Sequence, residues 1–347
     1  MAVLGLPSAP MATHKGLMPH ASYVPLRNLS AYSLLEGAIA PKNLAARAKS
    51  LGFPAAALTD RNGLYASMSY SDAASKAGVQ PIIGTTLAVA RPDRPDNAAL
   101  VLDWLVLLAQ DETGYANLCE LVSQAHVDRP VEADAHVEFA AVQKHSGGLI
   151  CLTASGEGAL ARLIAEDQPG GAAAYLDRLE AIFGDRLYIE VSRTGDAIMD
   201  RAEDGLLDLA YARNLPIVAT NPACYADPAF HPAHDVLLCI ANSSYVESED
   251  RVRSSPQAWM KTGEDMAQMF SDLPEALANT LVVAQRCAVT APKRKPILPS
   301  LAGDLDGEKE QLRLDAEAGL VARLEKLGIT DEEQRTVYFD RLAFEIN

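Results

Sequence analysis

Seven short apolar segments alternate with helical segments over the first two thirds of this 347-residue chain, and this alternation restricts the possible folds. The apolar segments span residues 23–29, 54–59, 81–89, 101–109, 148–153, 187–192 and 216–220. Strands that alternate with helices build an α/β fold with a largely parallel sheet, either doubly wound or closed into a barrel. Periodicity does not choose between the two, but in both the functional side chains lie at the carboxyl ends of the strands.

The alternation stops near Tyr225, and the remaining chain is predicted to be helical. Residues 231–240, 262–270 and 273–287 are three predicted helices, and a proline-rich linker follows at residues 292–299. Beyond it, leucines recur at helical spacing over residues 308–327. The pattern predicts a variable N-terminal segment over 1–22, one domain over 23–291, and a linker with the start of another region over 292–347. Because the last predicted helix is still amphipathic at Asn347, we expect the complete protein to continue.

The net charge of −16 limits the classes of function. A protein that grips duplex DNA by itself carries a basic stripe, whereas the only compact basic run here is Lys293-Arg294-Lys295, which we interpret as solvated linker. Five dispersed cysteines without a CxxC pair favour the reducing cytoplasm and argue against a zinc site. The apolar runs are shorter than the roughly 20 residues that span a bilayer, which argues against a membrane protein.

Several motifs occur in a fixed order along the chain after residue 22. They are SAYSLLEGA (30–38), PAAALTD (54–60), AGVQPIIG (77–84), VATN (218–221), AHDVLLCI (233–240) and FSDLPEALANT (270–280). In sequence and order they resemble the N-terminal region of the alpha subunit of bacterial DNA polymerase III, the C-family replicative polymerase. The resemblance implies a PHP domain, named for polymerase and histidinol phosphatase. It further implies a seven-stranded β/α barrel, with the polymerase palm and thumb region beginning in residues 292–347.

The same resemblance implies what the complete protein does. It would be a DNA-directed DNA polymerase, a nucleotidyltransferase that extends a primer–template with dNTPs and Mg²⁺ held by palm carboxylates beyond Asn347. No catalytic residue is therefore expected in this chain. The segment would act as a scaffold that docks the proofreading exonuclease subunit within a holoenzyme that includes the sliding clamp.

Intact PHP domains hold catalytic metal ions on His, Asp, Glu and Cys side chains at strand ends, and the corresponding positions of this chain are altered. The stretch expected to carry histidines reads PLRNL (25–29), Thr-Asp-His reads TDR (59–61), and the motif near the last strand reads NPAC (221–224). The pocket residues are then Arg27, Leu29, Asp60, Arg61, Thr86, Glu190 and Cys224. Only Asp60, Glu190 and Cys224 could act as ligands, and two arginines oppose cation binding. We expect no metal in this pocket.

Two interpretations of the arginines remain open. Arg27 and Arg61 could replace the metal ions and form ion pairs with Asp60 and Glu190. Alternatively the pocket has drifted and both arginines reach solvent. Two features nearby receive structural interpretations, with His234 in a structural or capping role and the SGEG sequence at 155–158 as a turn into a helix.

Two other functions compete with the polymerase subunit. A stand-alone PHP phosphoesterase of the histidinol-phosphatase type would need the ligands that this chain lacks. An error-prone paralogue of the alpha subunit shares many of the motifs.

Overall fold

The computed structural model describes residues 21–92, 99–296 and 299–346. The chain divides into two compact units, Met1–Pro292 and Lys293–Asn347, which are described separately. Residues 1–20 of the expected N-terminal segment lie outside the described part of the chain.

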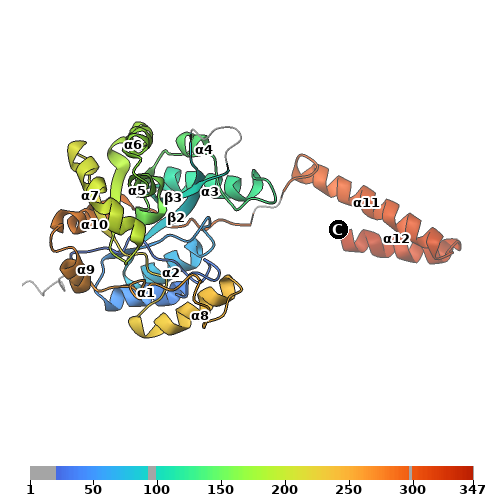
Figure 1. Ribbon diagram of the computed structural model, residues 1–347. Helices are drawn as coiled ribbons and strands as arrows, with labels where there is room; N and C mark the ends of the chain where they lie inside the picture. The colour runs from blue at the N-terminus through green and yellow to red at the C-terminus, as the bar shows by residue number, and fades with distance from the viewer. Residues whose placement is uncertain (1–20, 93–98, 297–298, 347) are drawn as a thin grey trace, which may run out of the picture. The chain divides into compact units, whose positions relative to one another are not determined.

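The first unit is built on a curled six-stranded sheet in the order β1-β2-β3-β4-β5-β6 (Figure 1). The strands are β1 Ala55–Leu58, β2 Gln80–Ala90, β3 Leu102–Ala109, β4 Leu149–Leu152, β5 Leu187–Ser192 and β6 Ile217–Thr220. The mixed α/β class agrees with the sequence prediction, but β3 runs antiparallel to both β2 and β4, so the sheet is less parallel than predicted. A parallel crossover needs about a dozen residues and usually a helix, whereas a short connection suits the antiparallel pairing of β2 and β3.

The predicted strand at residues 23–29 is not a regular strand, and the prediction of seven strands is wrong at this position. The segment lies between β1 and the chain after β6. On one side, its Pro25 and Asn28 carbonyls accept hydrogen bonds from the amides of Ala57 in β1 and of Thr59 just after it. On the other side, the Leu29 amide donates to the Ala223 carbonyl. Its own donors are diverted, because Pro25 has no N–H and the amides of Val24 and Asn28 bind threonine side chains. The ladder is therefore too irregular to count as a strand.

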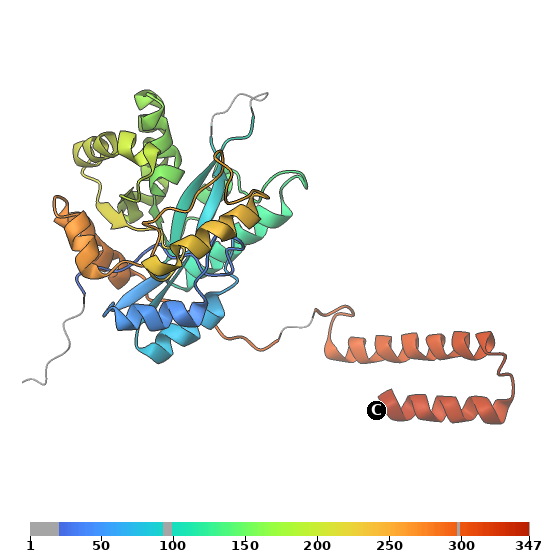
Figure 2. The ribbon, with the colours of Figure 1, turned by 60° about the horizontal axis from the view of Figure 1, so that its bottom comes forward.

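The helices of the first unit surround the curled sheet (Figure 2). They are α1 Pro41–Ser50, α2 Ser67–Ala77, α3 Glu112–Val127, α4 Phe139–Lys144, α5 Ala159–Ala165, α6 Pro169–Phe183, α7 Ala197–Ala212, α8 His231–Ala241, α9 Gly263–Met269 and α10 Pro274–Arg286. Short 3-10 turns occur at η1 Ser155–Glu157, η2 Gly184–Arg186 and η3 Pro228–Phe230.

Both faces of the sheet are buried, and they contribute to two separate cores. The outer core joins strand residues such as Leu58 and Leu107 to the surrounding helices. The inner core joins the alternate strand residues, such as Ala57 and Leu108, to Cys287 just after α10. Because successive side chains of a strand point to opposite faces, each strand serves both cores, and this explains why the strands are apolar without alternation.

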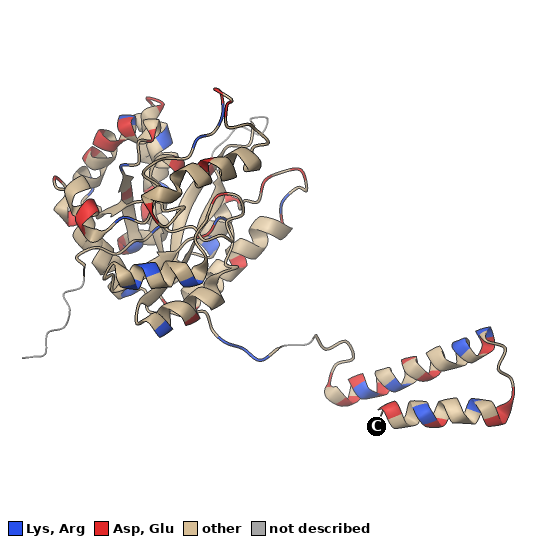
Figure 3. Cartoon of the chain, turned by 90° about the horizontal axis from the view of Figure 1, so that it is seen from below, with Lys and Arg blue, Asp and Glu red and all other residues tan. Residues whose placement is uncertain are grey.

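The strands carry only two charged side chains within the described residues, Asp103 and Glu190, whereas helices and loops carry many (Figure 3). Both carboxylates are buried and both bind arginine. Asp103 accepts from Arg91 at 2.8 Å and from Arg162 at 2.6 Å, which ties β3 to α5. Glu190 belongs to the pocket described below.

The second unit contains α11 Leu305–Lys326 and α12 Glu332–Ile346, which contact each other along their lengths. Leu324 is its one buried apolar side chain among the described residues, while Leu312, Val337 and Phe344 are exposed. No helix in the described part of the chain is long and apolar enough to cross a membrane.

Replacing Thr280 tests how α10 holds the irregular segment at residues 23–29. The buried Thr280 hydroxyl accepts from the Val24 amide at 3.0 Å and donates to the Leu277 carbonyl at 2.6 Å. Thr280→Val keeps the shape but leaves a buried amide without a partner, so we expect it to lower the free energy of unfolding by about 2 kcal/mol. Thr280→Ser keeps the hydroxyl and serves as the control. If urea unfolding gives Thr280→Val a free energy of unfolding at least as high as that of Thr280→Ser, this role is contradicted.

Candidate functional site

A pocket of about 720 Å³ opens at the carboxyl ends of the parallel strands. Its lining includes residues that follow β1, β4, β5 and β6, such as Arg61, Glu157, Thr194 and Cys224. Side chains of α8 and of the loop after it complete the wall. This is the edge at which strand-end chemistry is expected in an α/β fold.

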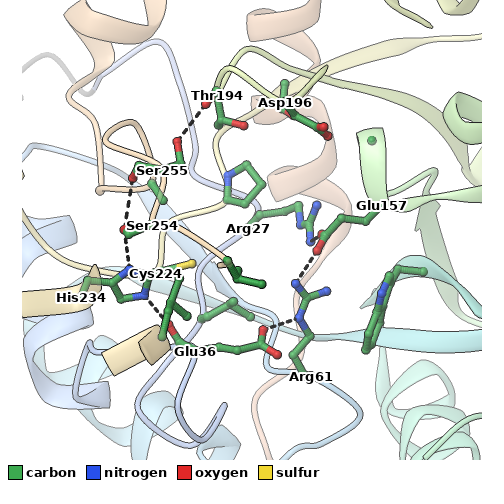
Figure 4. Close-up of a pocket in the computed structure, with 18 of the residues that line it drawn as sticks. Arg27, Glu36, Arg61, Glu157, Thr194, Asp196, Cys224, His234, Ser254 and Ser255 are labelled. Atoms are coloured by element: carbon green, nitrogen blue, oxygen red, sulfur yellow. Dashed lines mark hydrogen bonds and ion pairs between the residues drawn. The ribbon is translucent and has the colours of Figure 1, made fainter. Parts of the chain in front are cut away.

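One carboxylate of the pocket, Glu157, lies between two arginines (Figure 4). Arg27 Nη2 donates to Glu157 Oε2 at 2.6 Å, and Arg61 Nη2 donates to Glu157 Oε1. Arg61 Nε also donates to Glu36 Oε2 at 2.8 Å, and its guanidinium lies 4.4 Å from the centre of the Trp104 ring. Charge-assisted bonds and a cation–π contact therefore hold both cations in place.

The electrostatics of these groups follow from burial and from charge pairing. Burial opposes ionisation of Glu157, but Arg61 and Arg27 outweigh it and lower the pKa of Glu157 to about 2. Burial also opposes the charge of Arg27, and Glu190 and Glu157 nevertheless raise its pKa. The pKa of Arg61 rises for the same reason, with Glu157 and Glu36 opposing the effect of burial. The cluster is ionic at neutral pH.

Glu190 lies beneath the cluster and has no exposed surface. Its Oε1 accepts from Arg27 Nη1 at 3.3 Å and from Thr220 Oγ1 at 2.6 Å, while its Oε2 has no hydrogen-bond partner. Burial raises the pKa of Glu190 despite the nearby arginine. Arg27 therefore forms ion pairs with two carboxylates, the partly exposed Glu157 and the fully buried Glu190.

Asp60 is held by hydroxyl and amide donors. Its carboxylate accepts from the Ser30 amide at 2.7 Å, from Ser30 Oγ at 2.8 Å and from Ser33 Oγ at 2.7 Å. Within the described ranges Asp60 has no ion-pair partner, and burial raises its pKa. Asp60 fastens the loop at residues 30–33 to the end of β1.

The structure brings together only part of the predicted set of ion pairs. Arg27 contacts Glu190, as one of the two interpretations required, and with 2% exposure it does not reach solvent. Pairing of either arginine with Asp60 is wrong, since serine donors occupy that carboxylate. Arg61 binds Glu157 and Glu36 instead.

The other predicted pocket residues have different roles. Leu29 and Cys224 line the pocket, and burial raises the pKa of the Cys224 thiol to about 12, which keeps it protonated at neutral pH. Thr86 is buried in β2, where its hydroxyl donates to the Thr59 carbonyl at 3.0 Å. His234 has a structural role, because its ring nitrogens lie 2.7 Å from Ser254 Oγ and 2.7 Å from the Glu36 carbonyl. It joins α8 to the loop that presents Glu36.

Sequence reasoning missed Glu157, Glu36 and Trp104. The SGEG sequence was expected to turn into a helix, and it does so through η1 and α5. The sequence pattern did not indicate that the Glu157 side chain points into the pocket. Two consecutive residues before it, Ala154 at φ 60° and Ser155 at φ 51°, adopt the left-handed conformation that rarely occurs without glycine.

Several contacts stabilise this strained turn. Ser155 Oγ and Ser192 Oγ lie 2.5 Å apart, which joins the turn to the end of β5. At Gly158 a Cβ atom would overlap the Thr153 carbonyl oxygen, so the backbone can close tightly only with glycine there. The turn thereby places Glu157 between the two arginines.

The residues of the pocket do not fit a metal cluster. The positions at which the resemblance implied imidazole carry Arg27, Leu29 and Arg61, and all three residues line the pocket. Among the described residues no group of three or more His, Cys, Asp and Glu side chains is arranged to hold a metal ion. The chemistry of the donors present is that of ion pairing.

The chain is similar in sequence to known proteins. A family model of the PHP domain matches residues 25–194. DNA polymerase III subunit alpha of Caulobacter vibrioides is 43% identical over 93% of this chain, and that of Rickettsia bellii is 33% identical over 94%. DNA polymerase III subunit alpha of Pseudomonas aeruginosa is 34% identical over 94% of this chain. In all three, the chain spans 28% of the length of the relative.

Replacing Glu157 with glutamine should destabilise the domain in a pH-dependent way. The loss of a buried pair costs about 3–5 kcal/mol, and since 33% of this side chain is exposed we expect about 2 kcal/mol at neutral pH. The pKa of Glu157 falls from 4.5 to about 2 on folding, so its contribution is complete above about pH 4.5 and is lost as the pH falls toward 2.

The measurement is urea unfolding of Glu157→Gln and of the unaltered chain between neutral and acidic pH. The stability difference between them should narrow as the solution is acidified. Glu264→Gln, at an exposed glutamate of α9, is the control and should change stability little. A difference that stays constant down to about pH 3 would rule out the shared ion pair as its source.

Replacing Ala154 with glycine should relieve backbone strain in the same turn. Because Ala154 adopts φ 60°, glycine relieves strain, but it also removes a fully buried methyl group, so the free energy of unfolding should change by less than about 0.5 kcal/mol. At the exposed Ala46 within α1 the same substitution should lower it by about 1 kcal/mol. Thermal unfolding of both variants measures the two effects, and a loss at Ala154 as large as the loss at Ala46 would show that the turn is unstrained.

Proposed function

This chain contains a PHP domain and is homologous to the N-terminal region of bacterial DNA polymerase III alpha subunits, and from this we propose that its PHP pocket is a non-catalytic scaffold. The observation that carries the proposal is the Arg27–Glu157–Arg61 cluster. Two guanidinium groups fill the part of the pocket where a phosphoesterase would converge its metal ligands. A cation entering that space would meet two positive charges that are already bonded to their carboxylates.

The complete protein is proposed to be a DNA-directed DNA polymerase. Its relatives are more than three times longer than this chain, so the chemistry of nucleotidyl transfer would reside in the remainder. That part would bind primer–template DNA and dNTPs and would hold Mg²⁺ on palm carboxylates. The two helices of the second unit, α11 and α12, would begin the palm and thumb region. Their exposed Leu312, Val337 and Phe344 suit packing against further chain.

The proposed partners are proteins of the replicative holoenzyme in the cytoplasm. A domain with an inert pocket would offer a rigid surface for docking the proofreading exonuclease subunit, and the sliding clamp would join the same assembly. The acidic character of the chain supports protein docking over strong duplex binding, because phosphate contacts need clustered cations.

A stand-alone phosphoesterase is not favoured. The similarity to polymerase alpha subunits covers 93% of the chain and extends beyond residues 25–194, which the PHP model matches. No feature of the pocket supplies the missing ligands.

The scaffold proposal is tested by elemental analysis and by phosphoesterase assays on the purified chain. We expect no stoichiometric zinc, manganese or iron, and no metal-dependent hydrolysis of a phosphomonoester such as p-nitrophenyl phosphate. Cys224→Ser changes one candidate ligand in the pocket wall and should leave both results unchanged. Stoichiometric metal that is lost in Cys224→Ser, or in Asp60→Asn with folding verified by circular dichroism, would overturn the proposal.

A further inference from the structure

Helices α1 and α2 form a basic face on a strongly acidic protein. Lys42, Arg47 and Lys49 lie on α1, which has no acidic residue, and Lys76 lies on α2, where Asp72 is the one carboxylate. The two helices pack against each other, and Figure 3 shows blue positions grouped on this pair. We refer to Lys42, Arg47, Lys49 and Lys76 as the α1–α2 basic face. The chain as a whole carries a net charge of −16.

The four cations of this face are not neutralised by carboxylates. Within residues 21–92, 99–296 and 299–346 none of them forms an ion pair, and Lys49 Nζ donates to the Ala77 carbonyl at 2.6 Å. Elsewhere on the domain, arginines such as Arg193, Arg213 and Arg251 bind one or two carboxylates each. Other cations of the domain, such as Arg186 and Lys261, also bind carbonyls instead of carboxylates, so what distinguishes this face is the grouping of its cations on two packed helices.

A groove of about 520 Å³ runs between the two helices. It is lined by Lys42, Ala45, Ala46, Ser69, Asp72, Ala73, Lys76 and Ala77. Lys42 and Lys76 thus line the same groove, and alanines make its floor smooth. Along α1, Lys42 and Lys49 are seven residues apart, which is about 10 Å or two helical turns.

The lining decides which kind of polyanion fits. Protein interfaces depend on aromatic and large apolar anchors, and this groove is lined by neither. Phosphate backbones need only cations and small polar donors at close approach. We propose that the α1–α2 basic face binds the phosphate backbone of a nucleic acid without reading its bases.

The strength of such a site is limited by its size. Four phosphate contacts release few counterions, and the acidic remainder of the chain repels a polyanion. The site would therefore guide or hold a strand that another part of the complete protein binds more tightly. The sequence search for a compact basic run missed it, because residues 42–49 and 76 come together only when α1 packs on α2.

The test is fluorescence anisotropy of the full 347-residue chain with a labelled 20-nucleotide single strand and the matching 20-base-pair duplex. Binding should be detectable at low salt, and log K for the duplex should fall with log salt at a slope of about −3.6, as expected for about four contacts. The variant Lys42→Gln, Lys49→Gln, Lys76→Gln should reduce the slope to about −1 and weaken low-salt binding at least tenfold.

A charge-matched control separates this face from general electrostatics. Lys144→Gln, Lys309→Gln, Lys326→Gln removes the same charge from exposed positions elsewhere and should retain the slope of the unaltered chain. Thermal unfolding of both triple variants verifies folding. Equal losses in the two variants, or no binding by the unaltered chain at low salt, would overturn the proposal. So would a 20-residue poly-glutamate peptide that binds as tightly as the oligonucleotides, since that result would assign the face to an acidic protein segment.

Discussion

The pocket depends on a single carboxylate that two arginines share. Glu157 follows β4, Arg61 follows β1, and Arg27 belongs to the segment that lies between β1 and the chain after β6. Their ion pairs therefore link three separate parts of the curled sheet across its open end. A buried charge that loses its partner is strongly destabilising, so no member of this group can be exchanged alone without consequence. This mutual dependence gives the pocket a fixed internal arrangement in place of an adaptable set of ligands.

The pocket contains locally unfavourable features, and other contacts stabilise them. Ala154 and Ser155 adopt left-handed backbone conformations, and Glu190 has a buried oxygen without a partner. Strain of this kind persists only where surrounding interactions over-determine it. Here those interactions are the two arginines on one side and the contact between Ser155 and Ser192 on the other. This constraint supports the proposed role of the pocket as a rigid support.

Much of the fold could be predicted from the sequence, and the failures have identifiable physical causes. The apolar runs located all six strands, but the pattern could not show that the Val24 and Asn28 amides bind threonine side chains and so leave residues 23–29 irregular. In the pocket, Arg27 and Glu190 could be placed together because the resemblance implied that both belong to the same pocket. Glu157 could not be placed in the pocket, because the direction of its side chain depends on backbone angles that neither helix and strand propensity nor the resemblance specifies.

The distribution of charge over the structure likewise could not be predicted from the composition. The two carboxylates of the strands, Asp103 and Glu190, each bind arginine, so charge within the sheet is balanced locally. The net charge of −16 therefore belongs mainly to the surface, and it does not show where acidic and basic regions lie on that surface. Lys42, Arg47, Lys49 and Lys76 become neighbours only through the packing of α1 on α2. A region of opposite sign on an acidic protein is best detected once helix packing is known, because the field at a surface depends on nearby charges more than on their sum.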